Sequence, residues 1–249
     1  MSVVDEIRCS HCGAPVKFNP GEILATCAYC GFTQVVETGE AFVFEHSMIL
    51  NKFDMVSVET PVREWMKSGF LKPRDLAKSK LLEKNLTYLP FWMVPVKATT
   101  TYKGVFERIT PAVEKEGKIE KEYNWLVLAR KATEFPTKDY QVPLEGKIPY
   151  DFRRVEGFAK VLNSELQQLE AAEKAKQEIE NLHEFLIKED VDKIIEMKTD
   201  FAIGNVIYLH APVWFITYEY KHERYNLFLD GATATVIKGD IPSINVGLF

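Results

Sequence analysis

The arrangement of hydrophobic and polar positions divides the 249-residue chain into stretches of different texture. Residues 1–45 contain only short apolar runs broken by turn residues. Residues 86–150 and 205–240 are rich in Val, Thr, Tyr, Phe and Trp, which favour strands. Between them, residues 157–200 carry apolar positions at intervals of three and four, the period of an amphipathic helix. The pattern predicts an α+β fold, with a small N-terminal unit followed by two antiparallel β-units that flank a long helical insertion.

One apolar stripe without Gly or Pro predicts the helical insertion. It consists of Leu162, Leu166, Leu169, Ala172, Ile179, Leu182 and Leu186. We expect an interruption near residues 188–190, where "KED" replaces the apolar positions. The stripe thins to alanine in "EAAEKAKQE", so we expect that part to project into water or to pack lightly.

Two connections between strands are predicted from turn residues. The charged segment "PAVEKEGKIEKEY", residues 111–123, is expected to form an exposed hairpin loop. Asp230 and Gly231 lie between two strand-like runs and predict a tight hairpin turn, because both residues tolerate a positive φ.

The two β-units share a weak internal repeat. "YLPFWMVPVKATTTYKG" and "LHAPVWFITYEYKH" both place a Pro-x-Trp core before strand-forming residues and a Tyr-Lys pair. Trp92 and Trp214 in these cores could serve as stacking platforms for a ligand. Their apolar neighbours favour the alternative that both indoles fill the interior.

Residues 60–84 have an excess of basic side chains, and Pro73 is suited to the first turn of a helix running to about Lys84. The candidate partner-binding residues on that helix and beside it are Lys72, Arg74, Lys78, Lys80 and Lys84. Two interpretations stay open, since a run of charges is commonly a solvated face. These cations either bind an external partner or pair with the acidic helical insertion of the same chain.

Composition limits the class of protein. The formal net charge of -5 provides no overall attraction to nucleic acid or to anionic membranes. No apolar run approaches the roughly 18 to 20 residues that span a bilayer, and the N-terminus lacks a signal sequence. We expect a cytoplasmic protein without a membrane span.

All four cysteines lie within the first 30 residues, as Cys9-x-x-Cys12-Gly and Cys27-x-x-Cys30-Gly. Two such turns can present four sulfurs to one point, which is the tetrahedral arrangement that structural zinc prefers. The 14 residues between the pairs suffice for one hairpin, with its turn at residues 19–22. The spacing predicts one structural zinc ion in a ribbon over residues 1–45, and a second domain over residues 46–249.

Alternatives to zinc fit the sequence less well. A thioredoxin-like redox pair needs one Cys-x-x-Cys turn within a βαβ unit, and disulfides suit an extracellular chain. His11 could compete as a ligand, but an exposed turn residue is the simpler interpretation. Four thiolates leave no open position for water, so the zinc is expected to be structural. Acidic residues outnumber basic ones in the ribbon, which favours contact with protein over nucleic acid.

The sequence shows no recognisable catalytic motif. A phosphate-binding loop, a Gly-x-Ser-x-Gly turn and a His-Glu-x-x-His helix are all missing. His46, His183, His210 and His222 lie in unrelated sequence contexts. We expect His183 to be a solvated surface residue and His210 to be a strand residue with a satisfied hydrogen bond.

The order of these features resembles a family of prokaryotic TFIIB-type zinc-ribbon proteins, some of which are likened to the replication factor Y (primosomal protein N') helicase. The resemblance rests on the four-cysteine ribbon, the paired Pro-Phe-Trp and Pro-Val-Trp blocks and "VPLEGKIPYDFRRVEGF". Family members tend to end the last hairpin with Asn-Gly-x-Thr-Gly, where this chain has Ala234 in place of the second glycine. Some relatives continue into membrane helices, whereas this sequence ends at Phe249.

Three hypotheses for function follow. The first is a non-catalytic adaptor or scaffold that binds another macromolecule, with another protein as the leading partner. The second is a protein that binds nucleic acid or the ribosome through basic residues of the segment 63–108. The third is an enzyme of unrecognised type.

Overall fold

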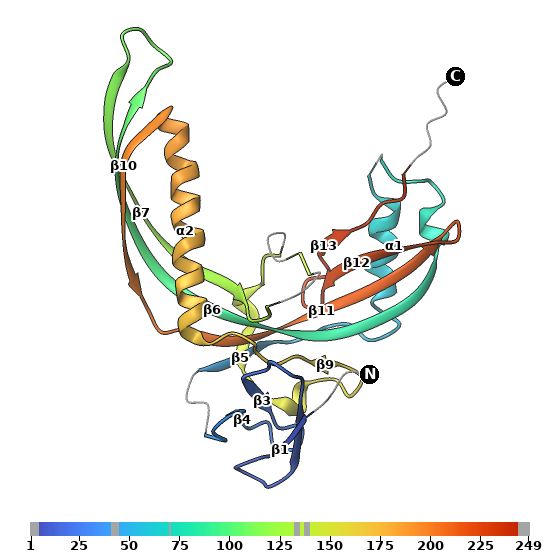
Figure 1. Cartoon of the computed structure of the whole chain (residues 1–249). Helices are drawn as coiled ribbons and strands as arrows, with labels where there is room; N and C mark the ends of the chain where they lie inside the picture. Colours follow the sequence, from blue (N-terminus) through green and yellow to red (C-terminus); the bar gives the residue numbers. More distant parts are fainter. Residues whose placement is uncertain (1–4, 41–44, 70, 132–134, 137–139, 244–249) are drawn as a thin grey trace. The chain divides into compact units, whose positions relative to one another are not determined.

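The computed structural model describes residues 5–40, 45–69, 71–131, 135–136 and 140–243. It is an α+β protein with two α-helices and mostly antiparallel strands (Figure 1). The predicted α+β class is therefore confirmed. The helices are α1 (Glu59–Lys67) and α2 (Gln168–Asp190), and short 3-10 helices lie at Leu76–Lys78, Leu144–Gly146 and Phe152–Arg154.

The strands fall into three sheets. Two small hairpins near the N-terminus are β1 (Asp5–Arg8) with β2 (Pro15–Phe18), and β3 (Leu24–Thr26) with β4 (Thr33–Val35). The remaining strands are β5 (His46–Ile49), β6 (Lys80–Phe106), β7 (Val113–Leu128), β8 (Lys147–Pro149), β9 (Lys160–Val161), β10 (Lys193–Ile203), β11 (Ile207–Tyr220), β12 (Glu223–Asp230) and β13 (Val236–Gly239).

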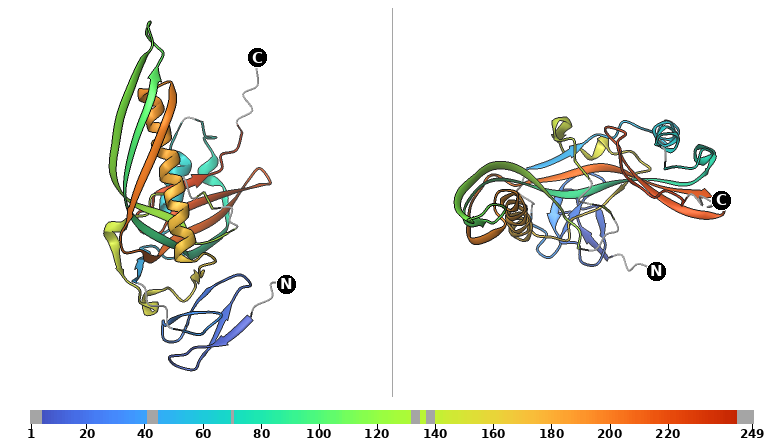
Figure 2. Two further views of the ribbon diagram at one scale, coloured as in Figure 1. Left: turned by 60° about the vertical axis from the view of Figure 1, so that its left-hand side comes forward. Right: turned by 90° about the horizontal axis from the view of Figure 1, so that it is seen from above.

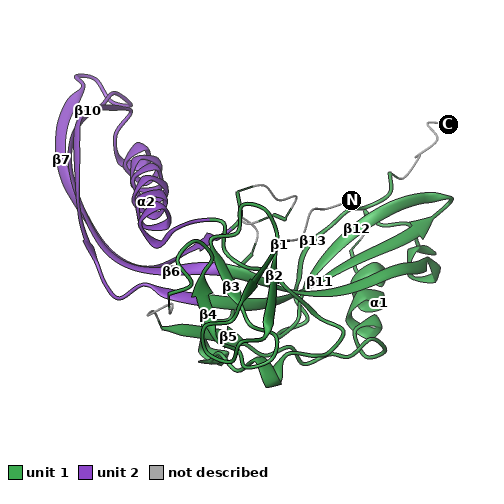
Figure 3. Cartoon of the chain, turned by 60° about the horizontal axis from the view of Figure 1, so that its bottom comes forward, with its two compact units in different colours: residues 1–90, 130–165, 209–249 green, residues 91–129, 166–208 purple. Residues whose placement is uncertain are grey.

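The chain forms two compact units that do not follow the predicted division at residue 45 (Figure 3). Unit 1 contains residues 1–90, 130–165 and 209–249, so the cysteine hairpins belong to the same unit as α1 and β11–β13. Unit 2 contains residues 91–129 and 166–208. Strand β6 supplies residues to both units, and so does β11.

The core of unit 1 is formed by apolar residues from α1 and from the strands. Val62 and Met66 of α1 pack with Trp214 of β11 and Leu229 of β12. Trp214 is fully buried, and its Nε1 donates a hydrogen bond of 2.9 Å to Asn51 Oδ1. The prediction that this tryptophan fills the interior is confirmed.

Unit 2 is a three-stranded sheet with one helix. Strand β6 lies between β7 and β10, antiparallel to both, and α2 runs along one face of the three strands (Figures 1 and 2). Trp92 is buried here, and its Nε1 donates to the Leu166 carbonyl at 3.0 Å. Each unit thus contains one tryptophan of the sequence repeat as a core anchor.

The predicted helical insertion over 157–200 is shorter than expected. Helix α2 ends at Asp190, where the interruption was expected, but residues 193–203 form strand β10 instead of further helix. The segment "KIIEMKTDFAI" alternates in exposure along most of its length, so pairing with β6 prevails over helical propensity. Ala171, Ala172 and Ala175 are buried, so the alanine-rich part of α2 packs closely instead of projecting into water.

Two predicted loops are also different. Residues 113–123 belong to β7, because their alternating charges pair across the strands, as in the 2.6 Å ion pair of Lys103 with Glu116. The connection after Asp230 is wider than a tight turn, since β13 begins only at Val236. In it Ala234, not Gly231, has the positive φ, at 64°.

The predicted basic helix over 73–84 is wrong. Leu76–Lys78 form a single 3-10 turn, and β6 begins at Lys80. Residues 80–86 extend β6 and bury Leu86 in the core of unit 1, which a continued helix would not do. The helix of this region is α1, ending at Lys67 with Gly69 at φ +86° beyond its C-cap.

Candidate metal centre

Each Cys-x-x-Cys turn closes its own hairpin, so the expected single hairpin between the pairs is replaced by two. Cys9 and Cys12 lie between β1 and β2, and Cys27 and Cys30 lie between β3 and β4. The turn at residues 19–22 joins the two hairpins, with the Glu22 N–H donating to the Asn19 carbonyl at 3.0 Å. The two cysteine turns have the same pattern of backbone hydrogen bonds. Each turn therefore presents two sulfurs in the same way.

The glycine after each pair is required by the backbone. Gly13 has φ +74° and Gly31 has φ +75°, which residues with a Cβ rarely adopt. Their N–H groups donate to the carbonyls of Cys9 and Cys27 at 2.8 and 2.9 Å. The chain therefore reverses direction within each turn and directs both of its sulfurs inward.

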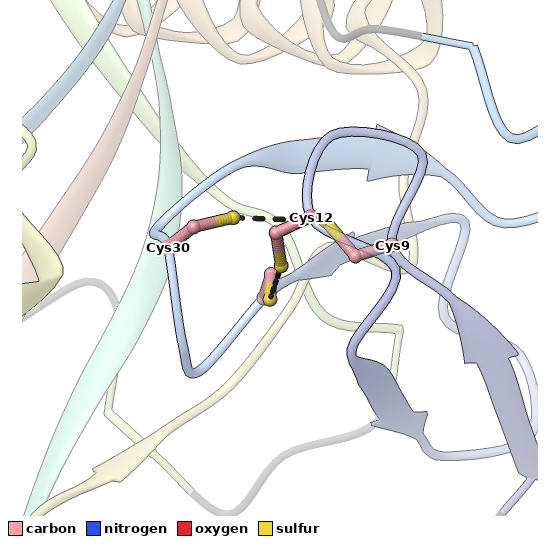
Figure 4. Close-up of side chains that lie close together, drawn as sticks. Cys9, Cys12 and Cys30 are labelled. Atoms are coloured by element: carbon pink, nitrogen blue, oxygen red, sulfur yellow. Dashed lines mark hydrogen bonds between the residues drawn. The ribbon is translucent and has the colours of Figure 1, made fainter.

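The four sulfurs form one cluster, and all lie within 4.8 Å of one another (Figure 4). Cys9 Sγ is 3.6 Å from Cys30 Sγ, and Cys12 Sγ is 3.7 Å from Cys27 Sγ. A tetrahedron with metal–sulfur bonds of about 2.3 Å has edges of about 3.8 Å, whereas a disulfide bond is about 2.05 Å long. Cys9, Cys12, Cys27 and Cys30 are thus positioned to bind a metal ion.

The electrostatics of the cluster favour a cation at its centre. Burial opposes ionisation of Cys9, but backbone N–H groups of Cys12 and His11 outweigh it and lower the pKa of Cys9 to about 7. Desolvation raises the pKa of Cys30 to about 12, and its hydrogen bonds with the neighbouring sulfurs act in the same direction. Four thiolates at this separation need a positive charge between them.

The hairpins that carry the cysteines are held by buried polar groups. Gln34 of β4 is 1% exposed and accepts from the Ser10 N–H at 2.8 Å through Oε1. Its Nε2 donates to the Arg8 carbonyl at 2.9 Å. One amide of the second hairpin therefore fixes the first cysteine turn.

A buried carboxylate joins these hairpins to the rest of unit 1. The Glu22 side chain is 1% exposed and accepts from Arg130 Nη1 at 2.9 Å and from Asn163 Nδ2 at 3.1 Å. Arg130 also pairs with Glu165 at 2.7 Å. The Ile23 N–H donates to the Ser164 carbonyl at 2.8 Å, so backbone pairing supports the same junction.

A second junction is a directed chain of hydrogen bonds through the partly buried His46 and the fully buried His210. His210 Nε2 lies 2.9 Å from the Leu162 carbonyl, which can only accept, so this nitrogen carries the proton. His210 Nδ1 then accepts from His46 Nε2 at 2.9 Å. His46 Nδ1 accepts in turn from the Thr33 hydroxyl of β4 at 3.3 Å.

Burial keeps both rings of this histidine pair neutral. It lowers the pKa of His210 to about 4, although the Leu162 carbonyl acts in the opposite direction. Burial holds the pKa of His46 well below its usual range, and a proton on the neighbouring His210 would lower it further. Tyr150 stacks on His46 with ring centroids 3.9 Å apart. The expected hydrogen bond of His210 is confirmed. His46 and His210, which lie in unrelated parts of the sequence, hydrogen bond to each other in the structure.

His183, expected at the surface, is buried in unit 2. Its Nδ1 lies 2.6 Å from Thr100 Oγ1, and its Nε2 lies 2.8 Å from the Tyr123 hydroxyl. Burial lowers the pKa of His183, with the charge of Lys121 acting in the same direction. This side chain satisfies polar groups between α2 and the sheet.

The candidate partner-binding residues divide into two groups. Lys72 lies 3.5 Å above the Trp65 ring, donates to the Trp65 carbonyl and has a pKa lowered by burial. Lys84 pairs with Glu59 of α1. Arg74, Lys78 and Lys80 are exposed and form no ion pair within the described ranges.

Other cations of the segment 63–108 are neutralised within the chain. Lys97 pairs with Glu120 at 2.8 Å, and Arg108 pairs with Asp192 at 2.7 Å. Because these cations already have carboxylate partners, the exposed cations of the segment that form no ion pair with a described residue are Lys67, Arg74, Lys78 and Lys80.

A cleft of about 590 Å³ lies beside the second cysteine turn. Tyr29 and residues 148–154 line it. The Tyr29 side chain is 72% exposed. Arg153 is held by Asp151 through bonds of 2.8 and 2.9 Å, whereas Arg154 forms no ion pair with any described residue. Sequence reasoning missed this cleft, because no spacing pattern connects residues so far apart.

The chain matches no known protein family, no curated protein and no solved structure. Over the described residues, neither helix has the length and apolar character needed to cross a membrane.

Proposed function

We propose that this chain is a non-catalytic zinc-ribbon protein, an adaptor or scaffold whose partner is another protein. The observation that carries the proposal is the closed four-sulfur cluster. Zinc suits four thiolates in a tetrahedron, and a centre with four protein ligands leaves no position for a reacting water. The same features underlie the proposed membership of the prokaryotic TFIIB-type family and a cytoplasmic location, where thiols stay reduced.

The cleft beside the second cysteine turn supports a protein partner. Exposed Tyr29 and Arg154 lie next to Phe152 and Pro149, and aromatic and arginine side chains commonly dominate protein interfaces. The metal would fix one wall of this cleft, since Tyr29 lies within the Cys27–Cys30 turn. A structural zinc ion therefore acts in this proposal by shaping a binding surface.

The proposal is tested by affinity capture from nuclease-treated lysate, with mass spectrometry of the bound proteins. Tyr29→Ala combined with Arg154→Ala should reduce capture of a stoichiometric partner at least tenfold. Phe185→Ala is the matched control, because this side chain is 64% exposed on α2 of unit 2. Equal capture by the cleft variant would refute the assignment of the cleft.

Nucleic acid is a second candidate partner, favoured by exposed Arg74, Lys78 and Lys80. A hydrogen bond from Tyr220 lowers the pKa of Asp75, and the charges of Lys221 and Lys78 lower it further. Lys221 lies in the turn between β11 and β12, so this turn adds a positive charge to the same surface. Binding to phosphates weakens steeply with salt, whereas an apolar protein interface does not. Replacing the three cations by Glu should abolish RNA or DNA binding if this candidate is correct, with Lys84→Glu as a control that breaks an internal pair.

A further inference from the structure

The outer edge of β10 has backbone groups available for another strand. Strand β10 pairs with β6 on one side, and none of the described residues pairs with its other side. An unpaired edge of this length is a template for strand addition unless charges or distortions block it. A bulge between Ile194 and Glu196 interrupts only its first residues.

The two faces of β10 differ in character. Thr199 lies opposite Thr100 of β6, and their hydroxyl groups are 2.8 Å apart. Thr100 also hydrogen bonds to His183 of α2, so both threonines lie on the face of the sheet that α2 covers. Met197 and Phe201 alternate with the charged positions and share the Thr199 face. Lys198 and Asp200 lie on the opposite face, with side chains 72% and 71% exposed, and form a long ion pair of 3.4 Å with each other. Solvent screens so exposed a pair, so both charges can exchange it for a contact with a second chain.

We propose that this edge binds the β10 edge of a second copy of the chain, antiparallel, with the two-fold axis at Thr199. In that register Met197 lies opposite Phe201 of the second copy, and Lys198 lies opposite Asp200. Ile195 is the extra residue of the bulge, so the regular pairing covers residues 196–202. Apolar residues thus meet apolar residues on one face, and opposite charges meet on the other.

The other free edge of unit 2 does not allow the same pairing. Strand β7 pairs only with β6 among the described strands, but its outward face carries Glu114, Glu116, Lys118, Glu120 and Glu122. In each antiparallel self-pairing centred on residues 117–120, at least one glutamate of this face lies opposite a glutamate of the second copy. Like charges directly opposite one another are destabilising, so the sequence selects β10 as the self-complementary edge.

The register predicts a reciprocal test by charge exchange. Lys198→Asp places Asp opposite Asp200 twice across the two-fold axis, and Asp200→Lys places Lys opposite Lys198 twice. Each single variant should therefore weaken dimerisation by about tenfold or more in Kd. An equimolar mixture of the two variants restores both Lys–Asp contacts, and so does the double exchange Lys198→Asp/Asp200→Lys within one chain.

The measurement is sedimentation equilibrium of the full-length chain from micromolar to millimolar concentration, with circular dichroism as the control for folding. The expected result is a concentration-dependent wild-type dimer, monomeric single variants, and dimers again in the mixture and in the double exchange. A monomeric wild type over this range would overturn the proposal. Single variants that dimerise like wild type, or a mixture that stays monomeric, would overturn it equally.

Hydrogen exchange of the wild-type chain gives an independent test that needs no variant. Amides of residues 196–202 that point away from β6 should gain protection as the concentration rises. Protection of those amides that does not change with concentration, while the chain dimerises, would assign the dimer to another surface and overturn the proposal.

Discussion

The cysteine hairpins of unit 1 and the helix-covered sheet of unit 2 are stabilised by different kinds of interaction. The buried apolar cluster of the hairpins is small and consists of Cys9, Val16, Ala25 and Cys27. The hairpins depend on four sulfurs, the Glu22–Arg130 pair and two neutral histidines. Unit 2 buries Ile179 and Ile187 of α2, and its one buried histidine bonds to hydroxyl groups. Changes of metal, charge or pH should therefore act on unit 1 and leave unit 2 folded.

Removal of a metal ligand should have the largest effect. Cys27→Ser deletes a buried sulfur, and metal binding supplies about 10 kcal/mol or more of folding free energy in small zinc domains. Amides of residues 5–36 should lose protection in hydrogen exchange, while those of α2 keep theirs. Tyr29→Ala, in the same turn, should change neither. Retained protection of β1–β4 in the Cys27→Ser chain would contradict this description of the hairpins.

Breaking the buried ion pair should have the next largest effect. Arg130→Met leaves the Glu22 carboxylate buried without its cation and should lower the free energy of unfolding by about 3 to 5 kcal/mol. Urea denaturation measures this change. Arg153→Met is the control, because its side chain is 88% exposed and solvent screens its pair with Asp151, so this variant should lose far less stability. Similar losses for the two variants would show that burial does not distinguish them.

Acid should destabilise unit 1 through the histidine pair. The pKa of His210 is about 4 when folded and near 6.5 in an unfolded chain, so the unfolded state binds the proton first. Its stabilisation is complete above about pH 6.5 and is lost as the pH falls to about 4, with a total of about 3 kcal/mol. His210→Gln should flatten this part of the pH profile, whereas His222→Asn, at an exposed turn, should not. A wild-type profile that is flat between pH 6.5 and 4.5 would rule out the mechanism.

The smallest expected effect is a gain in stability. Ala234 has φ +64°, which costs a residue with a Cβ about 1 to 2 kcal/mol relative to glycine. Glycine also raises the conformational entropy of the unfolded chain, which offsets part of this gain. Ala234→Gly should therefore stabilise unit 1 by about 0.5 to 1 kcal/mol. Ala232→Gly, in the same loop without a positive φ, should destabilise it. Thermal unfolding of the two variants in opposite directions is the expected outcome.

The sequence predicts a site best where the residues that form it are close together in the chain. Cys9 and Cys12 are joined by a single turn, so their spacing alone indicates a shared ligand. His46 and His210 lie 164 residues apart, and no local pattern shows that they meet. The helix expected over 73–84 failed for a related reason, because pairing with distant strands determines the conformation of residues 80–86.

The charged strand β7 shows a second limit of sequence reasoning. Its run of Glu and Lys resembles a solvated loop, since no apolar side of the strand is evident there. The lysines of β6 that pair with it lie elsewhere in the chain, as in Lys97 with Glu120. The recurrence of charged residues at every second position, from Glu114 to Glu122, was the available signal, and it became meaningful only beside the partner strand.

The central claim is that Cys9, Cys12, Cys27 and Cys30 bind one zinc ion in a closed site. The most direct measurement is elemental analysis of the purified chain combined with X-ray absorption at the zinc edge. We expect one zinc ion per chain, surrounded by four sulfur atoms at about 2.3 Å. Well under one zinc per chain, bound iron in its place, or nitrogen or oxygen among the ligands would contradict it.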